Sequence, residues 1–422
     1  MQNCSRRDFL KTSAVLGAAT TLPLLPSVRA QSPNNKLRVA VVGVNGRGMS
    51  HVGAFLKMPD VEIAYICDVD TRALAKGLEH AGGKAKGVSD FRRILDDKSI
   101  DALSFAVPNH WHAPATIMSC SAGKHVYIEK PGSHDPFEAE MIVAAARKFN
   151  RVVQQGTQRR SWPWIQEAIK RIHAGEIGNV RFARTWYNNS RGSIGAGKPV
   201  AVPEWLDYNM WQGPAPEQPF VDNLVHYNWH WRWHYGNGEI GNNGIHVLDV
   251  ARWGLGVGFP KRISCTGGRY HFKDDQQTPD TAIATFDFGD KGVTFDSHSC
   301  DPHGFENATF GIMFYGDKGT LVIGNSSYKI YDPYNKQIEE KKGGGGEKGH
   351  FANFVDCVRT GKRPNADIGE CQKSTMLCHL ANIAYRTGHT INFDGATRKI
   401  VADPDADRLW KREYRVGWEP KV

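Results

Sequence analysis

The chain lacks three features that would each define a class of protein. Its eight cysteines form no C-x-x-C pair, which argues against a zinc site or a dithiol redox motif. Its basic residues form no block and accompany no nucleic-acid motif, so the net charge of +9 indicates a solvated surface and no nucleic-acid partner. Beyond residue 30, no apolar run is long enough to cross a membrane.

The cysteines that are present leave one pairing open. Cys4 lies in the N-terminal segment, and the other seven are an odd number, so at least one stays unpaired. Cys265 and Cys300 lie in strand-like segments and could pair in an oxidising compartment. Buried free thiols are the alternative, and we favour it because free cysteine packs as a small apolar residue.

Residues 1–30 have the three parts of an export signal. The sequence Ser5-Arg6-Arg7-Asp8-Phe9-Leu10-Lys11 is a twin-arginine motif, an apolar stretch follows, and Val28-Arg29-Ala30 resembles a cleavage site. An uncleaved membrane anchor is the alternative. We predict a periplasmic protein that is exported already folded by the twin-arginine route and meets a membrane only through the export machinery.

The rest of the chain is long enough for two domains with full cores. Residues 37–155 alternate apolar, β-branched runs with helical patterns, which predicts a parallel sheet covered on both faces. A long irregular stretch from 190 to 238 follows. The later part predicts an open, largely antiparallel sheet, with strands expected at 179–188, 262–270, 280–288, 292–299, 308–315 and 320–323, and helices at 161–174, 241–254, 348–360 and 370–387.

A glycine-rich turn follows the first expected strand. Gly43-Val44-Asn45-Gly46-Arg47-Gly48 stands between a strand and a helix, where glycines allow a tight turn and the helix N-terminus favours phosphate. Asn45 replaces the middle glycine of G-x-G-x-x-G, a mild departure because Asn tolerates left-handed geometry. We therefore predict an α/β protein, with an N-terminal Rossmann dinucleotide-binding domain at 31–155 and a C-terminal α+β domain on an open, largely antiparallel sheet at 156–422.

Asp68 ends the second expected strand and indicates which dinucleotide binds. An acid there accepts hydrogen bonds from both ribose hydroxyls and repels a 2′-phosphate, so NAD is favoured over NADP. The alternative is a turn residue that caps the next helix. Asp70 competes for the capping role.

Two further segments carry a family resemblance. Pro108-Asn109-His110-Trp111-His112 is followed by Glu129-Lys130-Pro131, and with the glycine turn the chain resembles the Gfo/Idh/MocA oxidoreductases over nearly all of its length after the signal. The resemblance implies a homo-oligomer, a dimer or tetramer, and a cofactor site made by Gly43, Asn45, Gly46, Arg47, Gly48, Asp68, Pro108, Asn109, His112, Glu129 and Lys130.

Lys130 has a physical reason to be catalytic. It falls at a carboxyl end of the expected sheet, where open α/β folds bind ligands. A cation there holds a hydroxyl substrate and stabilises a developing alkoxide. The resemblance implies the same role, and a surface lysine is the alternative.

The expected helix at 241–254 carries a polar stripe. Asn242, His246 and Asp249 share one face by helical spacing, and histidine is the natural general base near neutral pH. The family commonly has D-x-x-x-H here, so Asn242 is a departure that can hydrogen-bond but cannot take a proton. We predict His246 as the base and Asn242 as a positioning residue. For His246 the alternative is an ordinary histidine of the core. Asp249 either orients His246 or contacts substrate, and the alternative for it is an ordinary ion pair on the helix.

Aromatic residues crowd the segment from 226 to 235. Flat faces with hydrogen-bonding edges suit carbohydrate rings, and the alternative is a wall that packs against the core or a partner subunit. Three histidines at helical spacing, His226, His230 and His234, suggest a metal, but the neighbouring aromatics and glycines lead us to predict none. The predicted substrate contacts are Arg159, Arg160, Tyr187, Trp229, His230, Trp231 and Asp249.

Soluble nicotinamide cofactors are an intracellular resource, so an exported enzyme needs to carry its dinucleotide with it. The sequence therefore predicts a tightly bound cofactor. The sequence predicts an NAD-dependent oxidoreductase acting on a CH–OH group of a sugar, glycoside or cyclitol. One alternative is an NAD-dependent glycosidase that works by transient oxidation and elimination. The other is a non-catalytic sugar-binding protein.

Overall fold

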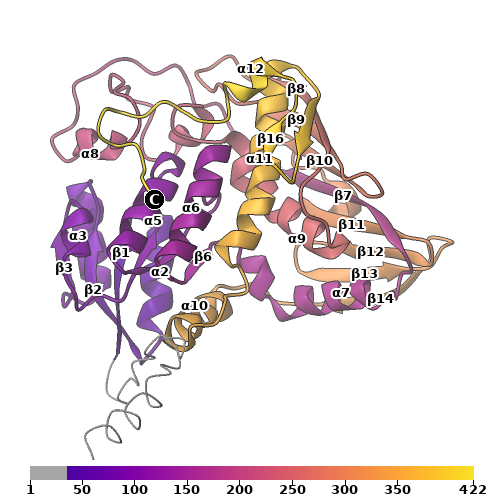
Figure 1. Cartoon of the computed structure of the whole chain (residues 1–422), viewed down its shortest axis with the longest axis horizontal. Helices are drawn as coiled ribbons and strands as arrows, with labels where there is room; N and C mark the ends of the chain where they lie inside the picture. The colour runs from indigo at the N-terminus through magenta and orange to yellow at the C-terminus, as the bar shows by residue number, and fades with distance from the viewer. Residues whose placement is uncertain (1–35) are drawn as a thin grey trace, which may run out of the picture. The chain divides into compact units, whose positions relative to one another are not determined.

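The computed structural model describes residues 36–422, which begin with a six-stranded parallel sheet of order β3-β2-β1-β4-β5-β6 (Figure 1). Strand β1 pairs in parallel with both β2 and β4, so the strand order reverses beside it. This doubly wound order places a ligand at the carboxyl ends of the strands beside the reversal. The strands are β1 (Leu37–Val42), β2 (Val61–Cys67), β3 (Lys86–Val88), β4 (Ala102–Phe105), β5 (His125–Ile128) and β6 (Val153–Gln155).

Side-chain caps begin two of the helices around this sheet. Asp70 accepts hydrogen bonds from the first turn of α3, and Asp135 accepts one from Glu138 N over 2.7 Å at the start of α6. Pro136 follows at the first helical position of α6, where its missing N–H costs nothing. The helices are α2 (Arg47–Leu56), α3 (Thr71–His80), α4 (Arg92–Leu95), α5 (Asn109–Ser121) and α6 (Pro136–Lys148).

A ten-stranded sheet forms the later part, in the order β14-β13-β12-β11-β7-β10-β9-β8-β15-β16. Its strands pair antiparallel except β7 with β10. The strands are β7 (Val180–Asn188), β8 (Arg262–Gly268), β9 (Thr281–Asp287), β10 (Gly292–His298), β11 (Phe310–Gly316), β12 (Gly319–Ile323), β13 (Ser327–Tyr331), β14 (Gln337–Lys342), β15 (Ile391–Asp394) and β16 (Lys399–Ile400).

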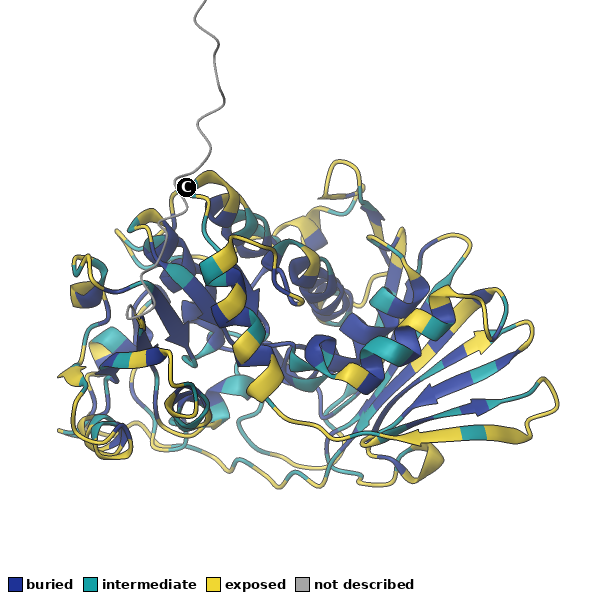
Figure 2. Ribbon diagram, turned by 90° about the horizontal axis from the view of Figure 1, so that it is seen from below, coloured by how far each residue is buried: buried dark blue, intermediate teal, exposed yellow. Residues whose placement is uncertain are grey.

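One face of the large sheet is covered by helices. Buried residues alternate with exposed or half-buried ones along β9 and with half-buried ones along β10, as expected for strands with one covered face (Figure 2). The covering helices α7 (Pro163–His173), α9 (Ile245–Leu255) and α11 (Ile368–Thr387) pack on it with buried apolar side chains. Helix α11 also contacts α6 and thereby joins the two sheets, while α10 (Lys348–Thr360) packs on α2 (Figure 1).

The fold class predicted from the sequence is confirmed, with local differences. The expected helix at 241–254 begins as a π-helix, Ile240–Gly244, before α9. Strands β3, β13, β14, β15 and β16 were not expected from the sequence; β3 has only three residues, and β14 is largely exposed and charged. The export signal at 1–30 lies outside the described residues. In the described part, no helix is both long and apolar enough to cross a membrane.

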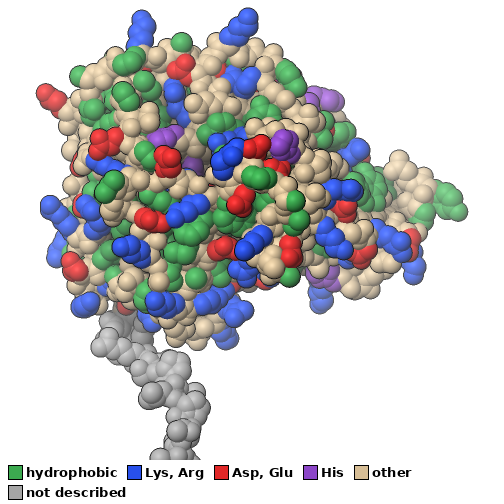
Figure 3. Space-filling model, turned by 45° about the horizontal axis from the view of Figure 1, so that its top comes forward, with side chains coloured by type: hydrophobic (Ala, Val, Ile, Leu, Met, Phe, Trp, Pro, Cys, Tyr) green, Lys and Arg blue, Asp and Glu red, His purple; other side chains and the backbone are tan. Residues whose placement is uncertain are grey.

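In the part of the chain that the structure describes, charges of both signs are mixed on the surface (Figure 3) and the cysteines are unpaired. On the face seen in Figure 3, Lys and Arg side chains are interspersed with Asp and Glu. All seven cysteines from Cys67 onward are free thiols, including Cys265 and Cys300. The possible Cys265–Cys300 bond is therefore not formed here, and the free-thiol alternative matches the structure.

Candidate functional site

A cleft of about 630 Å³ opens where β1, β2, β4 and β5 end. This is the edge at which a doubly wound sheet binds its ligand. Of the residues predicted to hold the cofactor, all but Gly48 line the cleft: Gly43, Asn45, Gly46, Arg47, Asp68, Pro108, Asn109, His112, Glu129 and Lys130.

The glycine turn is shaped by close approach of the backbone. A Cβ on Gly43 would lie 2.7 Å from Ala106 O, and one on Gly48 would lie 1.8 Å from Gly43 O. The left-handed residues are Gly43 and Gly46, with φ of 80° and 97°, so Asn45 does not use the left-handed geometry that we expected of it. No side chain caps α2 at Gly46. The first N–H groups of α2 therefore remain for a phosphate, and this turn fits a pyrophosphate.

Asp68 is held in place by the backbone. Its Oδ2 accepts from Val44 N over 2.7 Å and its Oδ1 from Asp70 N over 2.9 Å. Burial raises the pKa of Asp68, and these two N–H donors oppose the shift. Asp70 caps α3, so the capping alternative for Asp68 is wrong. The Asp68 carboxylate lines the cleft at the end of β2 and fits a ribose there.

Lys130 and Asn242 meet inside the cleft. Lys130 Nζ donates to the backbone O of Asn242 over 2.8 Å and to its Oδ1 over 2.7 Å. The π-helical turn at Ile240–Gly244 presents both acceptors to the lysine. An ammonium has three N–H donors, so one remains for a ligand. Burial lowers the pKa of Lys130, while Glu129 and Glu239 oppose that shift.

Glu129 fixes the backbone just before the lysine. Its carboxylate accepts from Arg47 Nε over 2.8 Å, from His51 Nε2 over 3.1 Å and from Lys130 N over 3.2 Å. Burial raises the pKa of Glu129, but Arg47 and His51 outweigh it and hold that pKa well below its usual range. The Arg47 guanidinium also pairs with Glu347. Arg47 therefore orders the wall of the cleft with its side chain.

His246 lies beside the cleft and does not line it. It is buried, and its Nδ1 has no hydrogen-bond partner among the described residues. Burial and the positive charges of Lys130 and Arg159 lower the pKa of His246 well below its usual range. The neutral form of the ring is therefore favoured, and a neutral imidazole keeps one nitrogen that can accept a proton.

Asp249 is engaged elsewhere and does not orient His246. Its two carboxylate oxygens accept from Arg160 Nε and Nη2 over 2.7 and 2.8 Å, and Ser374 Oγ donates over 2.6 Å. Both Arg160 and Asp249 are buried and neither lines the cleft. The pair joins the segment after β6 to α9, so the ion-pair alternative describes Asp249. We correct the expectation that Arg160 and Asp249 face a substrate.

The remaining expected substrate contacts divide between the cleft and the core. Tyr187, Trp229 and His230 line the cleft, with Trp229 stacked on His230 at 3.6 Å between ring centroids. Trp231 is 2% exposed and lies outside the lining, so it packs in the core. Arg159 stacks over Phe310 at 3.5 Å and also lies outside the lining.

The three histidines at helical spacing do not converge. His226 Nε2 pairs with Asp70 over 2.8 Å, and His230 Nδ1 donates to Tyr227 O over 2.6 Å. His234 Nε2 donates to Pro216 O over 2.7 Å. The segment is not one helix, since only a short 3₁₀ turn spans Asn228–Trp231. The spacing on which a metal site would depend is therefore absent here.

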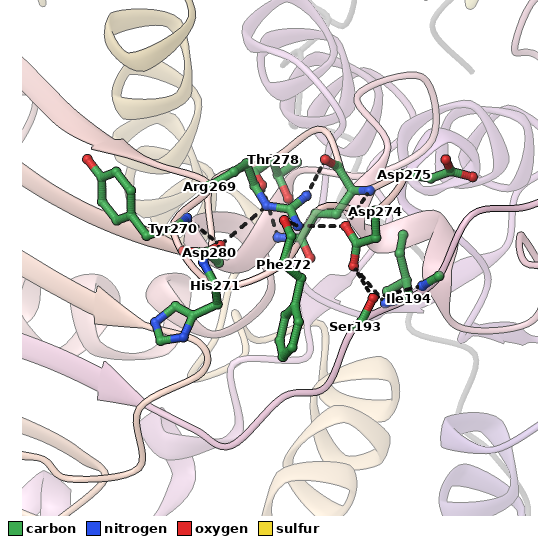
Figure 4. Close-up of polar contacts among 12 residues, drawn as sticks. Ser193, Ile194, Arg269, Tyr270, His271, Phe272, Asp274, Asp275, Thr278 and Asp280 are labelled. Carbon is green, nitrogen blue, oxygen red and sulfur yellow. Dashed lines mark hydrogen bonds and ion pairs between the residues drawn. The ribbon is translucent and has the colours of Figure 1, made fainter.

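Residues 189–238 form a strap, irregular except for the short helix α8 (Tyr208–Gln212) and a 3₁₀ turn, that reaches the cofactor side of the cleft. Thr71 N donates to Trp205 O over 2.9 Å, and Asp207 N donates to Val69 O over 3.0 Å. At its start the strap is pinned to the loop after β8 (Figure 4): Asp274 accepts from Ser193 Oγ over 2.7 Å, and Arg269 Nη2 holds the other Asp274 oxygen over 2.6 Å. The long irregular stretch expected over a site thus runs along the cleft.

Sequence reasoning missed Glu239, the acidic member of a charged pair at the substrate side. Glu239 is 2% exposed, pairs with Arg191, and accepts from Asn243 Nδ2 and Ser299 Oγ. Arg191 and Asn243 line the cleft. The sequence did contain a signal for this residue: Glu239 is an acid in an otherwise uncharged, glycine-rich segment, three residues before Asn242.

The fold and the cleft define an oxidoreductase with an NAD-binding Rossmann domain. Residues 37–157 match the model described as the oxidoreductase family, NAD-binding Rossmann fold, and residues 175–287 and 312–420 match that of the same family's C-terminal alpha/beta domain. The chain belongs to the Gfo/Idh/MocA oxidoreductase family. Residues 3–23 match the twin-arginine translocation signal, which indicates export by that route.

Relatives and similar structures are distant. A glycosyl hydrolase family 109 protein of Saccharopolyspora erythraea is 26% identical over 48% of this chain and 49% of its own length. The levoglucosan dehydrogenase of Pseudarthrobacter phenanthrenivorans is 26% identical over 52% and 51%. The chain thus spans about half the length of these relatives. A solved levoglucosan dehydrogenase in complex with NADH and levoglucosan has a TM-score of 0.68 at 18% identity, over 85% of this chain and 99% of that one.

Proposed function

We propose that this protein is a periplasmic NAD-dependent oxidoreductase that acts on a secondary hydroxyl of a sugar, glycoside or cyclitol. One observation carries the proposal: Lys130 holds a free N–H donor inside the cleft, at the same sheet edge as the glycine turn and Asp68. The levoglucosan dehydrogenase relative supports a carbohydrate substrate.

The chain's residues divide the reaction between them. Bound NAD supplies a hydride acceptor. The third N–H of Lys130 donates to the substrate oxygen and stabilises its developing negative charge. His246 lies beside the cleft and is our candidate for the base that takes the alcohol proton, since its Nδ1 has no partner among the described residues, and Asn242 positions Lys130. Tyr187, Trp229 and His230, which line the cleft, contact the sugar.

We also propose that the cofactor is held tightly. The strap bonds to Val69 and Thr71, directly beside Asp68, and His226 pairs with Asp70. These contacts hold the strap against the loop that carries Asp68, which supports slow release of NAD. A prosthetic NAD agrees with export of the folded protein away from the intracellular cofactor pool.

A second candidate function is an NAD-dependent glycosidase that oxidises, eliminates and reduces. The glycosyl hydrolase family 109 relatives favour it. Mass spectrometry of products from a panel of glycosides separates the two. A keto-sugar supports the oxidoreductase, and a shortened glycoside with no net redox change supports the glycosidase. No product of either kind, from protein that holds NAD, would leave only the non-catalytic sugar-binding alternative and contradict the proposal.

We propose that residues 31–155 hold the cofactor and that 156–422 bind substrate and form a homo-oligomer, a dimer or tetramer. The uncovered face of the large sheet exposes Phe182 of β7 and, paired with it, Tyr315 of β11. Exposed apolar residues on the uncovered face of a sheet support a subunit interface. Light scattering after gel filtration tests the oligomer, and a monomer at micromolar concentration would contradict it.

A further inference from the structure

Glu239 stands immediately before the π-helical turn that carries Asn242. It is almost completely buried and does not line the cleft. None of the roles assigned above to cofactor, substrate or proton transfer uses it. A buried carboxylate needs hydrogen-bond donors or a cation around it, so the partners of Glu239 indicate its role.

Five donor groups surround this carboxylate. Arg191 donates from Nε and Nη2, and Ser299 donates from Oγ. From the turn itself, Asn243 Nδ2 donates to Oε1, and Asn242 Nδ2 donates to the same oxygen over 3.4 Å. Residues three and four positions apart share one face of a helical turn, so both asparagines reach Glu239. The carboxylate therefore ties the start of the strap to the turn.

The Asn242 amide lies between a cation and an anion. Its Oδ1 accepts from Lys130 Nζ over 2.7 Å, and its Nδ2 donates to Glu239. An ammonium only donates and a carboxylate only accepts, so the amide can bridge the two in one orientation only. A rotated amide would turn its NH2 group toward the ammonium and its oxygen toward the carboxylate. Glu239 therefore fixes which end of Asn242 faces the lysine.

The same carboxylate adds a negative charge near Lys130. Burial lowers the pKa of Lys130, while the charges of Glu129 and then Glu239 oppose that shift. The Asn242 side chain that touches Nζ is neutral, so it contributes no charge of its own. The ammonium form of the lysine is the one that stabilises negative charge on a substrate oxygen. Loss of Glu239 would therefore favour the form that cannot do so.

We propose that Glu239 is a positioning residue of this site, which orients the Asn242 amide toward Lys130 and places a negative charge behind that amide. Where the family commonly has an acid at position 242, this chain has the acid three residues earlier and a neutral bridge between it and the lysine. The catalytic meaning of this arrangement rests on the proposed function. The contacts among the three side chains depend on no substrate.

Acetylation of Lys130 measures its protonation without turnover. Acetic anhydride reacts with the neutral amine, so brief labelling of the purified full-length protein, with the NAD that it holds, gives the pH at which half of the lysine is neutral. Peptide mass spectrometry reads the label, and exposed Lys336 in the same digest is the internal reference. In Glu239→Gln we expect the Lys130 midpoint to fall by about one pH unit. Glu138→Gln removes another buried carboxylate that pairs with an arginine, outside the cleft lining, and should leave the midpoint unchanged.

A second substitution moves the charge to the other side of the bridge. In Glu239→Gln combined with Asn242→Asp, the new carboxylate lies directly against Nζ, so the midpoint should return at least to its wild-type value. A role of Glu239 in packing alone would not be restored in this way. The alkaline fall in kcat/KM should move in the same direction as the labelling midpoint in both variants.

Thermal unfolding checks that each variant is folded. If Glu239→Gln is not, Glu239→Gln combined with Arg191→Gln decides, because removal of both charges leaves neither of them buried and unpaired. Its midpoint should still lie below that of the wild type, since Glu239 affects Lys130 more than Arg191 does.

An unchanged midpoint after loss of Glu239, or a lowered one that Asn242→Asp fails to restore, overturns the proposal. The expected midpoints in a protein that turns over no carbohydrate would instead support the role of Glu239 and contradict the proposed function.

Discussion

Lys130 donates from one ammonium to two oxygens of a single residue, the backbone O and the side-chain Oδ1 of Asn242. Because the amide of Asn242 is neutral, it holds the lysine in place without balancing its charge. The negative charges that favour the protonated lysine are those of Glu129 and Glu239. Because residue 242 is Asn where the family commonly has Asp, no carboxylate at that position offsets the burial of Lys130. Its pKa is lowered, and it lines the same cleft as the glycine turn.

Asn242→Asp should restore a balancing charge. A carboxylate at hydrogen-bond distance raises the pKa of Lys130, so the fall in activity at alkaline pH, where the lysine loses its proton, should move upward by about one pH unit. The pH profile of kcat/KM measures this. Asn243→Asp is the matched control, since Asn243 bonds Glu239 and not Lys130. An equal alkaline shift in both variants, or none in either, would contradict the role given to Asn242.

Asp68→Asn tests cofactor choice. The amide would point an N–H group at Val44 N or Asp70 N, and the charge that repels a 2′-phosphate would be gone. We expect NAD affinity to fall at least tenfold and the preference over NADP to shrink, as measured by fluorescence titration of protein stripped of cofactor. Asp90→Asn, which alters a carboxylate outside the cleft lining, should change neither value. Unaltered discrimination in Asp68→Asn would remove Asp68 from the ribose site.

Gly48→Ala tests the close packing of the turn. Its Cβ would lie 1.8 Å from Gly43 O, a backbone atom that cannot move aside cheaply. We expect a loss of about 2 kcal/mol or more in the free energy of unfolding, and loss of bound NAD. Gly53→Ala in the same helix meets only His80 Nε2 at 3.7 Å and should be neutral or stabilising. Denaturant unfolding compares them, and equal stability of the two variants would show that the turn tolerates a side chain.

Acid should destabilise the fold through its histidines. Burial lowers the pKa of ten of them in the folded state, to about 4 for His350 and about 3 for His379; the ten are His51, His110, His112, His125, His134, His230, His234, His246, His350 and His379. Below about pH 6.5 the unfolded chain binds more protons than the folded one. The free energy of unfolding therefore decreases as the pH decreases, by up to about 1.4 kcal/mol per pH unit for each histidine.

Calorimetry measures this as the Tm between about pH 8 and pH 5. Asp135, whose pKa is raised to about 7, titrates with the opposite sign, as do Asp68 and Glu140, whose pKa values are also raised, but the ten histidines outnumber these carboxyls. His379→Gln should flatten the slope, and His389→Gln, at an exposed position, should not. A Tm that holds steady or rises on acidification would show that these histidines are not buried neutral.

The site divides into a part that the sequence could predict and a part that it could not. Gly43, Asp68 and Lys130 each follow an expected strand within a residue or two, so local pattern placed them at one sheet edge. The pairing of Asp249 with Arg160 joins segments far apart in the chain, and helical spacing suggested His246 instead. Trp229 and Trp231 lie in the same aromatic segment, so the sequence does not distinguish them. The 3₁₀ turn that contains both places Trp229 in the cleft lining and Trp231 outside it.

The central claim is that this protein carries its own NAD and reduces it with a carbohydrate. The most direct test is the near-ultraviolet absorbance of the reduced nicotinamide, followed after sugars or glycosides are added to purified protein without added cofactor. We predict that the absorbance rises by up to one equivalent of reduced cofactor per subunit in the wild type and not at all in Lys130→Met. On denaturation, Lys130→Met should release the same amount of NAD as the wild type. Protein that releases no NAD, or a Lys130→Met variant that reduces it at the wild-type rate, would contradict the account.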